Sequence, residues 1–173
     1  SSPETVECLL SRYSEPGDVV LDPFAGFGTT PVVAEAMDRE AWGVEYEPDR
    51  VAHVRDRVDH PDRVLEGDAR ELDALALPAV DCCLTSPPYA TEGSDVDPFR
   101  NYAGEGDYAT YLADVGETVA GVADLLAPGG RLVIEASNLR HDGGVTTLAW
   151  DLAAVGREHL ALETELVLRW TDG

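Results

Sequence analysis

The sequence contains no lysine: all 12 basic residues among its 173 are arginine, and 34 Asp and Glu residues leave a formal net charge of −22. Proteins normally bind phosphate groups through Lys and Arg, so this composition counts against a nucleic-acid partner. High salt screens both the self-repulsion of such a chain and its long-range interaction with phosphates. Because the acidic residues are spread over the whole chain, we interpret them as a salt-adapted surface, as in halophilic archaea, and not as a site for a basic partner.

Long apolar runs and abundant cysteine are also missing. No run approaches the ~20 residues that span a bilayer, and residues 1–4 show neither a basic start nor an apolar targeting segment. We therefore expect a soluble, cytoplasmic protein that does not associate with membranes. The three cysteines have no metal-ligand spacing, so we predict no metal site. Cys82 and Cys83 are neighbours in an apolar run and are expected to be buried on opposite faces of a strand.

Short β-type runs alternate with helical segments, which predicts an α/β fold with a mostly parallel, doubly wound sheet in a single domain, residues 1–173. The predicted strands are residues 19–21, 41–45, 64–66, 80–85, 132–135 and 162–170. The predicted helices are residues 31–37, with Thr30 as N-cap, and residues 48–58, 108–126 and 145–155. Residues 90–106 lack periodicity, and loops of this length are typical of functional lids or disordered segments.

A glycine-containing turn, Asp22-Pro23-Phe24-Ala25-Gly26-Phe27-Gly28-Thr29-Thr30, separates the first predicted strand from its helix. Glycines at this point let the backbone turn tightly and approach a ligand. The helix N-terminus beyond them favours a negative group, such as a carboxylate. A Gly-x-Gly alone also suits a dinucleotide, but Pro31 stands where a dinucleotide fingerprint has its third glycine.

Acidic residues follow the next two strands. Glu45, at the end of the second strand, is placed to accept hydrogen bonds from ribose hydroxyls, and Asp68, after the third, from an adenine amino group. Either residue alone is more simply an ordinary solvated acid or a helix cap. Three successive strand ends with suitable groups at one edge of the sheet favour a binding site.

A second motif, Ser86-Pro87-Pro88-Tyr89, directly follows the fourth strand. The prolines have no N–H, so this corner offers carbonyls and the Ser86 hydroxyl to an amino group without competing backbone donors. Tyr89 offers a flat face on which a flipped-out base can stack. Taken alone, a double proline indicates a plain turn with the tyrosine in the core.

Together these motifs resemble the DNA amino-methyltransferases, which methylate cytosine N4 or adenine N6. The resemblance covers almost the whole chain and begins with residues 2–10, which are similar to the family's region around the methionine end of S-adenosylmethionine. It implies a Rossmann-like, S-adenosylmethionine-dependent methyltransferase. The cofactor-binding residues that it implies are Asp22, Pro23, Phe24, Gly26, Gly28, Thr29, Thr30, Glu45, Asp68 and Ser86. The catalytic residues that it implies are Ser86, Pro87, Pro88 and Tyr89.

The resemblance also implies direct displacement, in which the exocyclic nitrogen attacks the methyl group of the sulfonium. The Ser86 hydroxyl and the Pro87 carbonyl then orient the amino group and stabilise the positive charge that develops on nitrogen. Neither is a general base at neutral pH, so proton loss is expected after transfer. Serine at the first position of the motif is similar mostly to the cytosine-N4 branch, whereas Asp is usual for adenine N6 and Asn for protein glutamine.

One departure concerns the substrate, because residues 90–106 are too short for the separate target-recognition region of the DNA enzymes. Phe99, Arg100 and Tyr102 either stack on or clamp a nucleotide, or belong to an acidic surface loop. Arg140 and His141 either meet a phosphate or, as we favour, form a turn. The family fold also expects one more strand after residues 162–170. Specificity is then expected from a partner subunit, an oligomer or residues outside this chain.

Three functions from different classes remain open. A nucleic-acid amino-methyltransferase is favoured, with cytosine N4 of DNA as the target and adenine N6 of DNA as an alternative. RNA is the runner-up substrate because guanine-N2 methyltransferases of transfer RNA use a similar tetrapeptide. The second is a protein or small-molecule methyltransferase on the same fold. The third is a non-catalytic cofactor-binding subunit. The intact tetrapeptide argues against the third function, and Ser86 argues against the protein-glutamine form of the second.

Overall fold

Five parallel strands form the central sheet, in the order β3-β2-β1-β4-β5, in a computed structural model that describes residues 1–169. The strands are β1 (Val19–Asp22), β2 (Glu40–Glu45), β3 (Val64–Glu66), β4 (Val80–Thr85) and β5 (Leu126–Ile134). The chain direction across the sheet reverses between β1 and β4, and ligands of such sheets bind at the carboxyl ends of the strands beside this reversal. The predicted fold class is confirmed.

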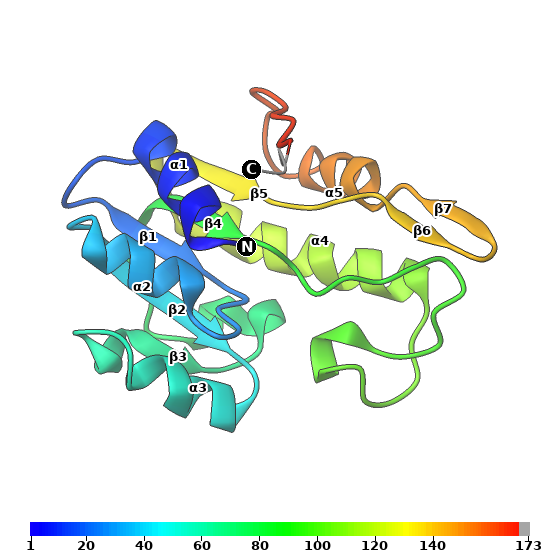
Figure 1. The fold of residues 1–173 in the computed structure, drawn as a ribbon, viewed down its shortest axis with the longest axis horizontal. Coiled ribbons are helices and arrows are strands. Elements are labelled where there is room, and N and C mark those ends of the chain that lie inside the picture. The colour runs from blue at the N-terminus through cyan, green and yellow to red at the C-terminus, as the bar shows by residue number, and fades with distance from the viewer. Residues whose placement is uncertain (170–173) are drawn as a thin grey trace.

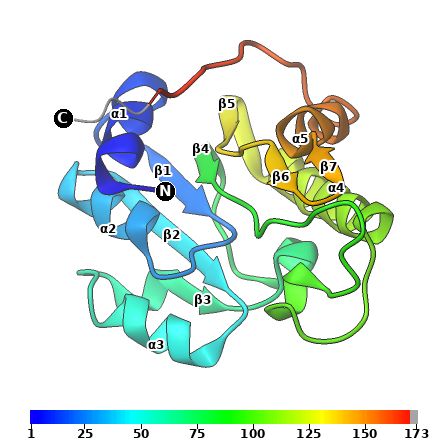
Figure 2. The ribbon, with the colours of Figure 1, turned by 45° about the vertical axis from the view of Figure 1, so that its right-hand side comes forward.

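Helices cover both faces of the sheet (Figures 1 and 2). On one face lie α1 (Pro3–Tyr13), α2 (Thr29–Ala36) and α3 (Pro48–Arg55). On the other lie α4 (Tyr108–Leu125) and the short helix η2 (Ala69–Ala74), and α5 (Leu148–Gly156) packs against α4. Cys82 packs with α1 and α2, whereas Cys83 packs with η2 and α4, so their predicted burial on opposite faces is confirmed. Burial raises the pKa of the Cys82 thiol to about 12 and that of Cys83 well above its ordinary value, so neither is a nucleophile at neutral pH.

Side-chain caps fix where two of the helices begin. The Ser2 hydroxyl accepts a hydrogen bond from the Thr5 N–H at 3.2 Å and starts α1, a helix that the sequence patterns did not predict. The Asp107 carboxylate accepts from the Thr110 N–H at 2.8 Å and starts α4. The α4 helix matches its predicted range of 108–126 to within one residue, and its buried residues include Val115, Val119 and Val122.

Several predicted boundaries were wrong. The α2 helix begins at Thr29, and its N-cap is Gly28, with a φ of 83°, instead of the predicted Thr30. The Thr30 hydroxyl does not cap the helix because it hydrogen-bonds to the buried Asp22 carboxylate. The α3 helix ends at Arg55 rather than 58, and β5 begins at Leu126 rather than 132. Two short helices of one turn each, η1 (Pro61–Arg63) and η3 (Pro98–Arg100), were not predicted.

The carboxyl-terminal predictions need the largest correction. Residues expected to start a helix at 145 form β7 (Gly144–Thr146), which pairs antiparallel with β6 (Leu139–His141), so α5 starts at Leu148. Arg140 and His141 therefore lie in a hairpin strand. Residues 162–169 form no strand, because no other strand of the described chain takes their backbone hydrogen bonds, and Trp170 lies outside the described residues. Within residues 1–169, no helix is both long and apolar enough to cross a bilayer.

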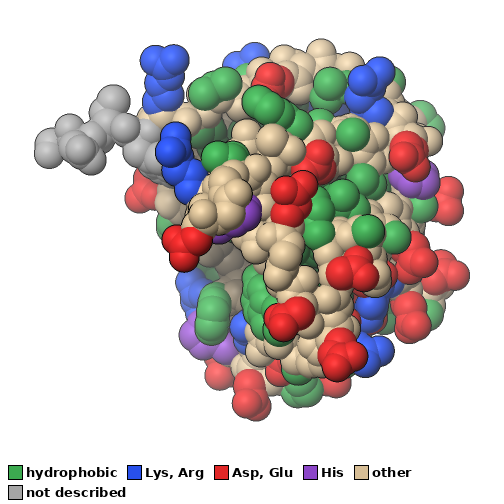
Figure 3. All heavy atoms as spheres, turned by 90° about the vertical axis from the view of Figure 1, so that its right-hand side faces the viewer, with side chains coloured by type: hydrophobic (Ala, Val, Ile, Leu, Met, Phe, Trp, Pro, Cys, Tyr) green, Lys and Arg blue, Asp and Glu red, His purple; other side chains and the backbone are tan. Residues whose placement is uncertain are grey.

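Acidic side chains are scattered over the surface rather than concentrated, as Figure 3 shows for one face. With a formal net charge of −22, repulsion among them opposes folding at low salt. Raising NaCl from about 0.1 M to about 2 M shortens the screening length from about 10 Å to below about 3 Å, so we expect the midpoint of thermal unfolding to rise.

A variant with less surface charge tests this cause. It replaces three exposed acids by their amides: Glu71→Gln, Asp73→Asn and Asp124→Asn. It is expected to unfold at a higher temperature than the wild type at low salt and at the same temperature at high salt. Equal differences at both salt concentrations would show that charge repulsion is not the cause.

Candidate active site

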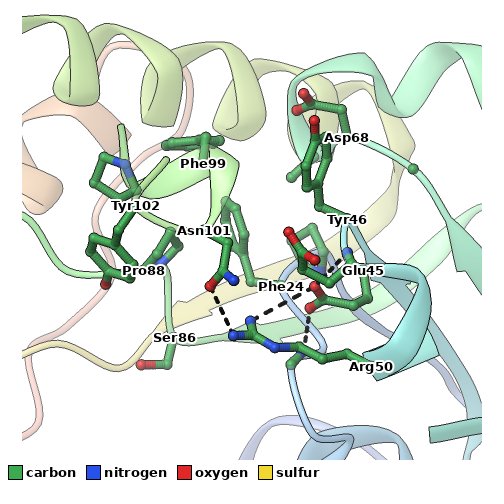
Figure 4. Close-up of a pocket in the computed structure, with 16 residues that line it drawn as sticks. Phe24, Glu45, Tyr46, Arg50, Asp68, Ser86, Pro88, Phe99, Asn101 and Tyr102 are labelled. Atoms are coloured by element: carbon green, nitrogen blue, oxygen red, sulfur yellow. Dashed lines mark hydrogen bonds and ion pairs between the residues drawn. The ribbon is translucent and has the colours of Figure 1, made fainter. Parts of the chain in front are cut away.

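A cavity of about 240 Å³ lies at the carboxyl ends of β1, β2 and β4 (Figure 4). Five segments that are distant in sequence supply its walls. The lining residues are Pro23, Phe24 and Gly26 after β1; Glu45, Tyr46, Glu47 and Arg50 from β2 to α3; Gly67, Asp68 and Ala69 after β3; Ser86 and Pro88 after β4; and Pro98, Phe99, Asn101 and Tyr102 from the 90–106 segment.

The two glycines of the turn after β1 have different tasks. Gly26 lines the cavity with a φ of 56°, and the nearest atom to an added Cβ is the Phe24 oxygen at 3.8 Å, so this position leaves space for a ligand. Gly28 does not line the cavity. A Cβ there would lie 2.7 Å from a methyl group of Val54, so Gly28 lets α2 and α3 pack closely. The sequence pattern had assigned both glycines to the ligand.

Glu45 holds the turn and faces the cavity. Its side chain is 7% exposed. One carboxylate oxygen accepts from the Gly26 N–H at 2.8 Å and the other from the Glu47 N–H at 2.9 Å. The Arg50 guanidinium lies 3.9 Å away. Each oxygen keeps a free lone pair, so the carboxylate can still accept a hydrogen bond from a ligand hydroxyl.

Asp68 also lines the cavity, and an arginine holds its carboxylate. Arg70 contacts both oxygens of Asp68, at 3.0 and 2.6 Å, and its other terminal nitrogen lies 3.1 Å from Asp114 of α4. Burial alone would raise the pKa of Asp68, but the hydrogen bonds and charge of Arg70 lower it below its ordinary value. Asp68 additionally caps η2, so the helix-cap interpretation of this residue applies as well.

A buried hydrogen bond joins the ends of the two central strands. The Thr85 hydroxyl, at the end of β4, donates to Asp22, at the end of β1, at 2.6 Å. Asp22 also accepts from the Phe24 N–H at 3.0 Å. Burial raises the pKa of Asp22, and hydrogen bonds from Thr85, Thr30 and the Phe24 N–H oppose that rise. Asp22 lies behind the cavity wall and positions both motifs.

The proline corner contributes Ser86 and Pro88 to the cavity, whereas Pro87 is buried and does not line it. The Tyr89 ring packs against the apolar cluster that contains Tyr111 and also does not line the cavity. The Glu135 N–H donates to the Thr85 carbonyl at 2.9 Å, and the Ser1 hydroxyl donates to the Glu135 carboxylate, so the N-terminus lies near this edge of the sheet.

The 90–106 segment folds back against the cavity through its 98–102 stretch. Phe99 is buried, with its ring centroid 5.4 Å from that of Phe24, edge to face. Arg50 donates to the Asn101 side-chain oxygen at 2.9 Å, which connects this stretch to α3 (Figure 4). Arg100 points elsewhere and pairs with Asp97 at 3.6 Å. The segment is thus neither a plain surface loop nor a clamp in which all three expected residues take part.

Of the thirteen residues expected to bind the cofactor or to be catalytic, seven line this cavity: Pro23, Phe24, Gly26, Glu45, Asp68, Ser86 and Pro88. Phe99 and Tyr102, two of the three candidate nucleotide contacts, line it as well. The others, Asp22, Gly28, Thr29, Thr30, Pro87 and Tyr89, lie outside its lining. Sequence reasoning missed Tyr46, Arg50, Arg70 and Asn101. For Tyr46 the sequence offered a signal, because an aromatic residue directly follows Glu45. The contacts of the two arginines depend on tertiary packing, so no local sequence signal could have indicated them.

The Thr85–Asp22 hydrogen bond generates a stability prediction. Thr85→Val leaves a buried carboxylate without one donor and is expected to lower the free energy of unfolding by about 1.5–3 kcal/mol. Urea titration at constant salt measures this change. The control Thr118→Val removes an equally buried hydroxyl that donates to the neutral Asp114 carbonyl. It is expected to lower the free energy by only about 0.5–1.5 kcal/mol. A Thr85→Val loss no larger than that of the control would contradict the role assigned to this bond.

Part of the chain is similar in sequence to known proteins. Residues 2–56 match the N6/N4 family described as DNA methylase. Over 56 residues the chain is 39% identical to the type II methyltransferase M.XycI of Xanthomonas campestris pv. cyanopsidis, covering 32% of this chain and 19% of that protein. The type II methyltransferase M.SmaI of Serratia marcescens is 43% identical over 51 residues, 30% of this chain and 17% of that protein. The matched segment therefore spans less than one fifth of either relative.

Solved structures resemble the chain over most of its length. A superposition on TrmN from Thermus thermophilus gives a TM-score of 0.62 at 25% identity and covers 78% of this chain and 38% of that one. A TehB-like SAM-dependent methyltransferase from Corynebacterium glutamicum gives 0.60 at 16% identity and covers 88% and 70%. These similarities confirm the predicted Rossmann-like arrangement.

Proposed function

We propose that this chain, whose residues 2–56 match the DNA methylase family, binds S-adenosylmethionine and transfers its methyl group to an exocyclic amino group of a DNA base, preferentially cytosine N4. The observation that carries the proposal is that the glycine turn after β1 and the proline corner after β4 line one cavity. The choice of cytosine N4 rests on the serine at position 86.

The residues around the cavity fit the cofactor in donor and acceptor character. Glu45 keeps free lone pairs for ribose hydroxyls, and the adjacent Tyr46 offers a flat face to an adenine ring. Gly26 leaves open space where any side chain would intrude. The Asp68 carboxylate keeps one lone pair beyond those used by Arg70 and can accept from the adenine amino group.

S-adenosylmethionine supplies an electrophilic methyl group when bound. Ser86 accepts a hydrogen bond from one N–H of the amino group of the base and so orients its lone pair. The resemblance assigns the hydrogen bond from the second N–H to the Pro87 carbonyl, although Pro87 lies outside the cavity lining. Both acceptors become more favourable as positive charge grows on the nitrogen. Neither is a general base at neutral pH, so the methylated, positively charged nitrogen loses its surplus proton to water after methyl transfer. The buried Asp22 holds the corner in place from behind.

Glu45→Ala removes the acceptor for the ribose hydroxyls and the anchor of the Gly26 N–H. We expect the dissociation constant for S-adenosylmethionine to rise at least about tenfold, equivalent to about 1.4 kcal/mol. Isothermal titration calorimetry measures it, with a thermal scan to show that the variant is folded. Glu66→Ala removes an exposed carboxylate from the neighbouring strand and should bind as the wild type does. Equal affinity in all three proteins would remove Glu45 from the site.

The reaction itself is tested by transfer of a tritiated methyl group to DNA, RNA and protein pools in molar salt, followed by nucleoside analysis. We expect label in DNA as N4-methylcytosine. Ser86→Ala should lower kcat, measured at saturating S-adenosylmethionine, at least about tenfold, which is about 1.4 kcal/mol of activation free energy. Ser94→Ala, outside the cavity lining, is the control. Label confined to RNA or protein would contradict DNA as the substrate. An unchanged kcat in Ser86→Ala would contradict the catalytic role of the Ser86 hydroxyl.

A further inference from the structure

The Arg70 side chain joins three elements at the end of the cavity where Asp68 and Tyr46 lie (Figure 4). From η2, its Nε and one terminal nitrogen donate to the two oxygens of Asp68, at 3.0 and 2.6 Å. The other terminal nitrogen donates to Asp114 of α4 at 3.1 Å. The guanidinium also lies over the Phe99 ring of η3, 5.2 Å from the ring centroid. One cation therefore connects two residues that line the cavity, Asp68 and Phe99, with the helix behind them.

The contact with Arg70 fixes the direction of the Asp68 carboxylate. A guanidinium is planar, and its parallel N–H groups match the two oxygens of a carboxylate. The Arg70 backbone N–H donates to the same oxygen as its Nε, at 3.0 Å. Three of the four lone pairs of the carboxylate are then used. Because Asp68 lines the cavity, the fourth is available to one donor group of a ligand.

The same contact keeps Asp68 ionised. Burial acts to raise the pKa of Asp68, whose side chain is 17% exposed, but the hydrogen bonds and charge of Arg70 lower it below its ordinary value. An ionised carboxylate accepts hydrogen bonds and donates none. It therefore suits the amino group at C6 of adenine, which donates, and repels the oxygen at C6 of a 6-oxopurine. A protonated Asp68 would lose this preference, because its hydroxyl could donate to that oxygen.

We propose that Arg70 is the residue through which the cavity selects an adenine over a 6-oxopurine. It is a positioning residue, because it acts through Asp68 and does not itself line the cavity. Asp114 and the Phe99 ring hold the guanidinium from its other sides, so it has little freedom to leave Asp68. The inference rests on the proposed function and deepens it, since it states which side chain makes the cofactor site specific.

Other charged groups also act on this cluster. Arg100 lowers the pKa of Asp68 further through its charge. The pKa of Asp114 is raised, because its burial outweighs the attraction of Arg70. The remaining acids that face the cluster or share its cavity are Asp97, Glu117 and Glu45. A ratio of affinities for two ligands that differ only at C6 cancels the contributions of groups that do not act on that position.

The probes are S-adenosylhomocysteine and S-inosylhomocysteine, in which an oxygen replaces the amino group at C6. Calorimetry measures both dissociation constants between about pH 7.5 and about pH 5, in about 1 M NaCl. The wild type should prefer the adenosyl compound at least about tenfold over this whole range, because Asp68 stays ionised. Arg70→Met should lower the ratio at least about threefold near neutral pH, where Asp68 is still ionised but no longer oriented. The ratio should fall further as the pH is lowered, because a carboxyl with a raised pKa then takes up a proton.

The control Arg55→Met removes another arginine that donates twice, in this case to the Val64 carbonyl at 3.0 and 2.7 Å. It should keep the wild-type ratio at every pH. A thermal scan shows whether each variant is folded. If Arg70→Met does not fold, the double variant Arg70→Met/Asp114→Asn, which also removes the second carboxylate left without its cation, is measured in its place.

An unchanged ratio in Arg70→Met overturns the inference. Equal losses of both affinities at every pH overturn it too, because they would show a purely structural role. A wild type that binds both compounds equally, or neither, has the same consequence. Failure of the proposed function gives a different result: the ratios behave as expected, but the wild type transfers no methyl group to DNA.

Discussion

The hydrogen bond between the Thr85 hydroxyl and the buried Asp22 carboxylate is the contact on which the rest of the site depends. β1 and β4 are neighbours in the sheet, but the chain between them makes a long excursion through two other strands. The glycine turn follows β1, and the proline corner follows β4. A short, buried hydrogen bond between the last residues of the two strands fixes the starting points of both loops relative to each other. Without it the two motifs would still be adjacent. Their relative orientation would then depend only on the backbone pairing of Val20 with Cys82 and of Leu21 with Cys83.

Carboxylates dominate the electrostatics of the cavity, and the fold holds each in a different way. Backbone N–H groups of Gly26 and Glu47 hold Glu45, Arg70 holds Asp68, and a hydroxyl and an N–H hold Asp22. A negative field of this kind favours a sulfonium and disfavours phosphates. Under the proposed function, recognition of a nucleic acid therefore has to rely on the flat face and the amino edge of a base more than on its phosphate backbone. High salt, which the surface composition fits, lowers the cost of bringing a phosphate chain to such a protein.

Local patterns sufficed to predict the fold class, the parallel sheet and the opposite faces of Cys82 and Cys83, because strand alternation and strand-end chemistry are written in neighbouring residues. They also indicated seven of the sixteen residues that line the cavity, since parallel strands bring their carboxyl ends to one edge. They failed where a residue's partner lies far away in sequence. Gly28 serves the packing of Val54, Tyr89 packs into a cluster built by α4 and α5, and Arg70 holds Asp68. The 162–169 segment has a strand-like pattern but no strand to pair with in the described chain, which no local pattern can reveal.

A crystal structure of the chain with S-adenosylhomocysteine tests the central claim most directly, because it places a ligand without any assumption about the substrate. The account predicts adenosine between Glu45, Tyr46 and Asp68, and a thioether sulfur that faces Ser86 across the turn at Gly26. A ligand bound elsewhere on the molecule, or one whose sulfur points away from the proline corner, would contradict it.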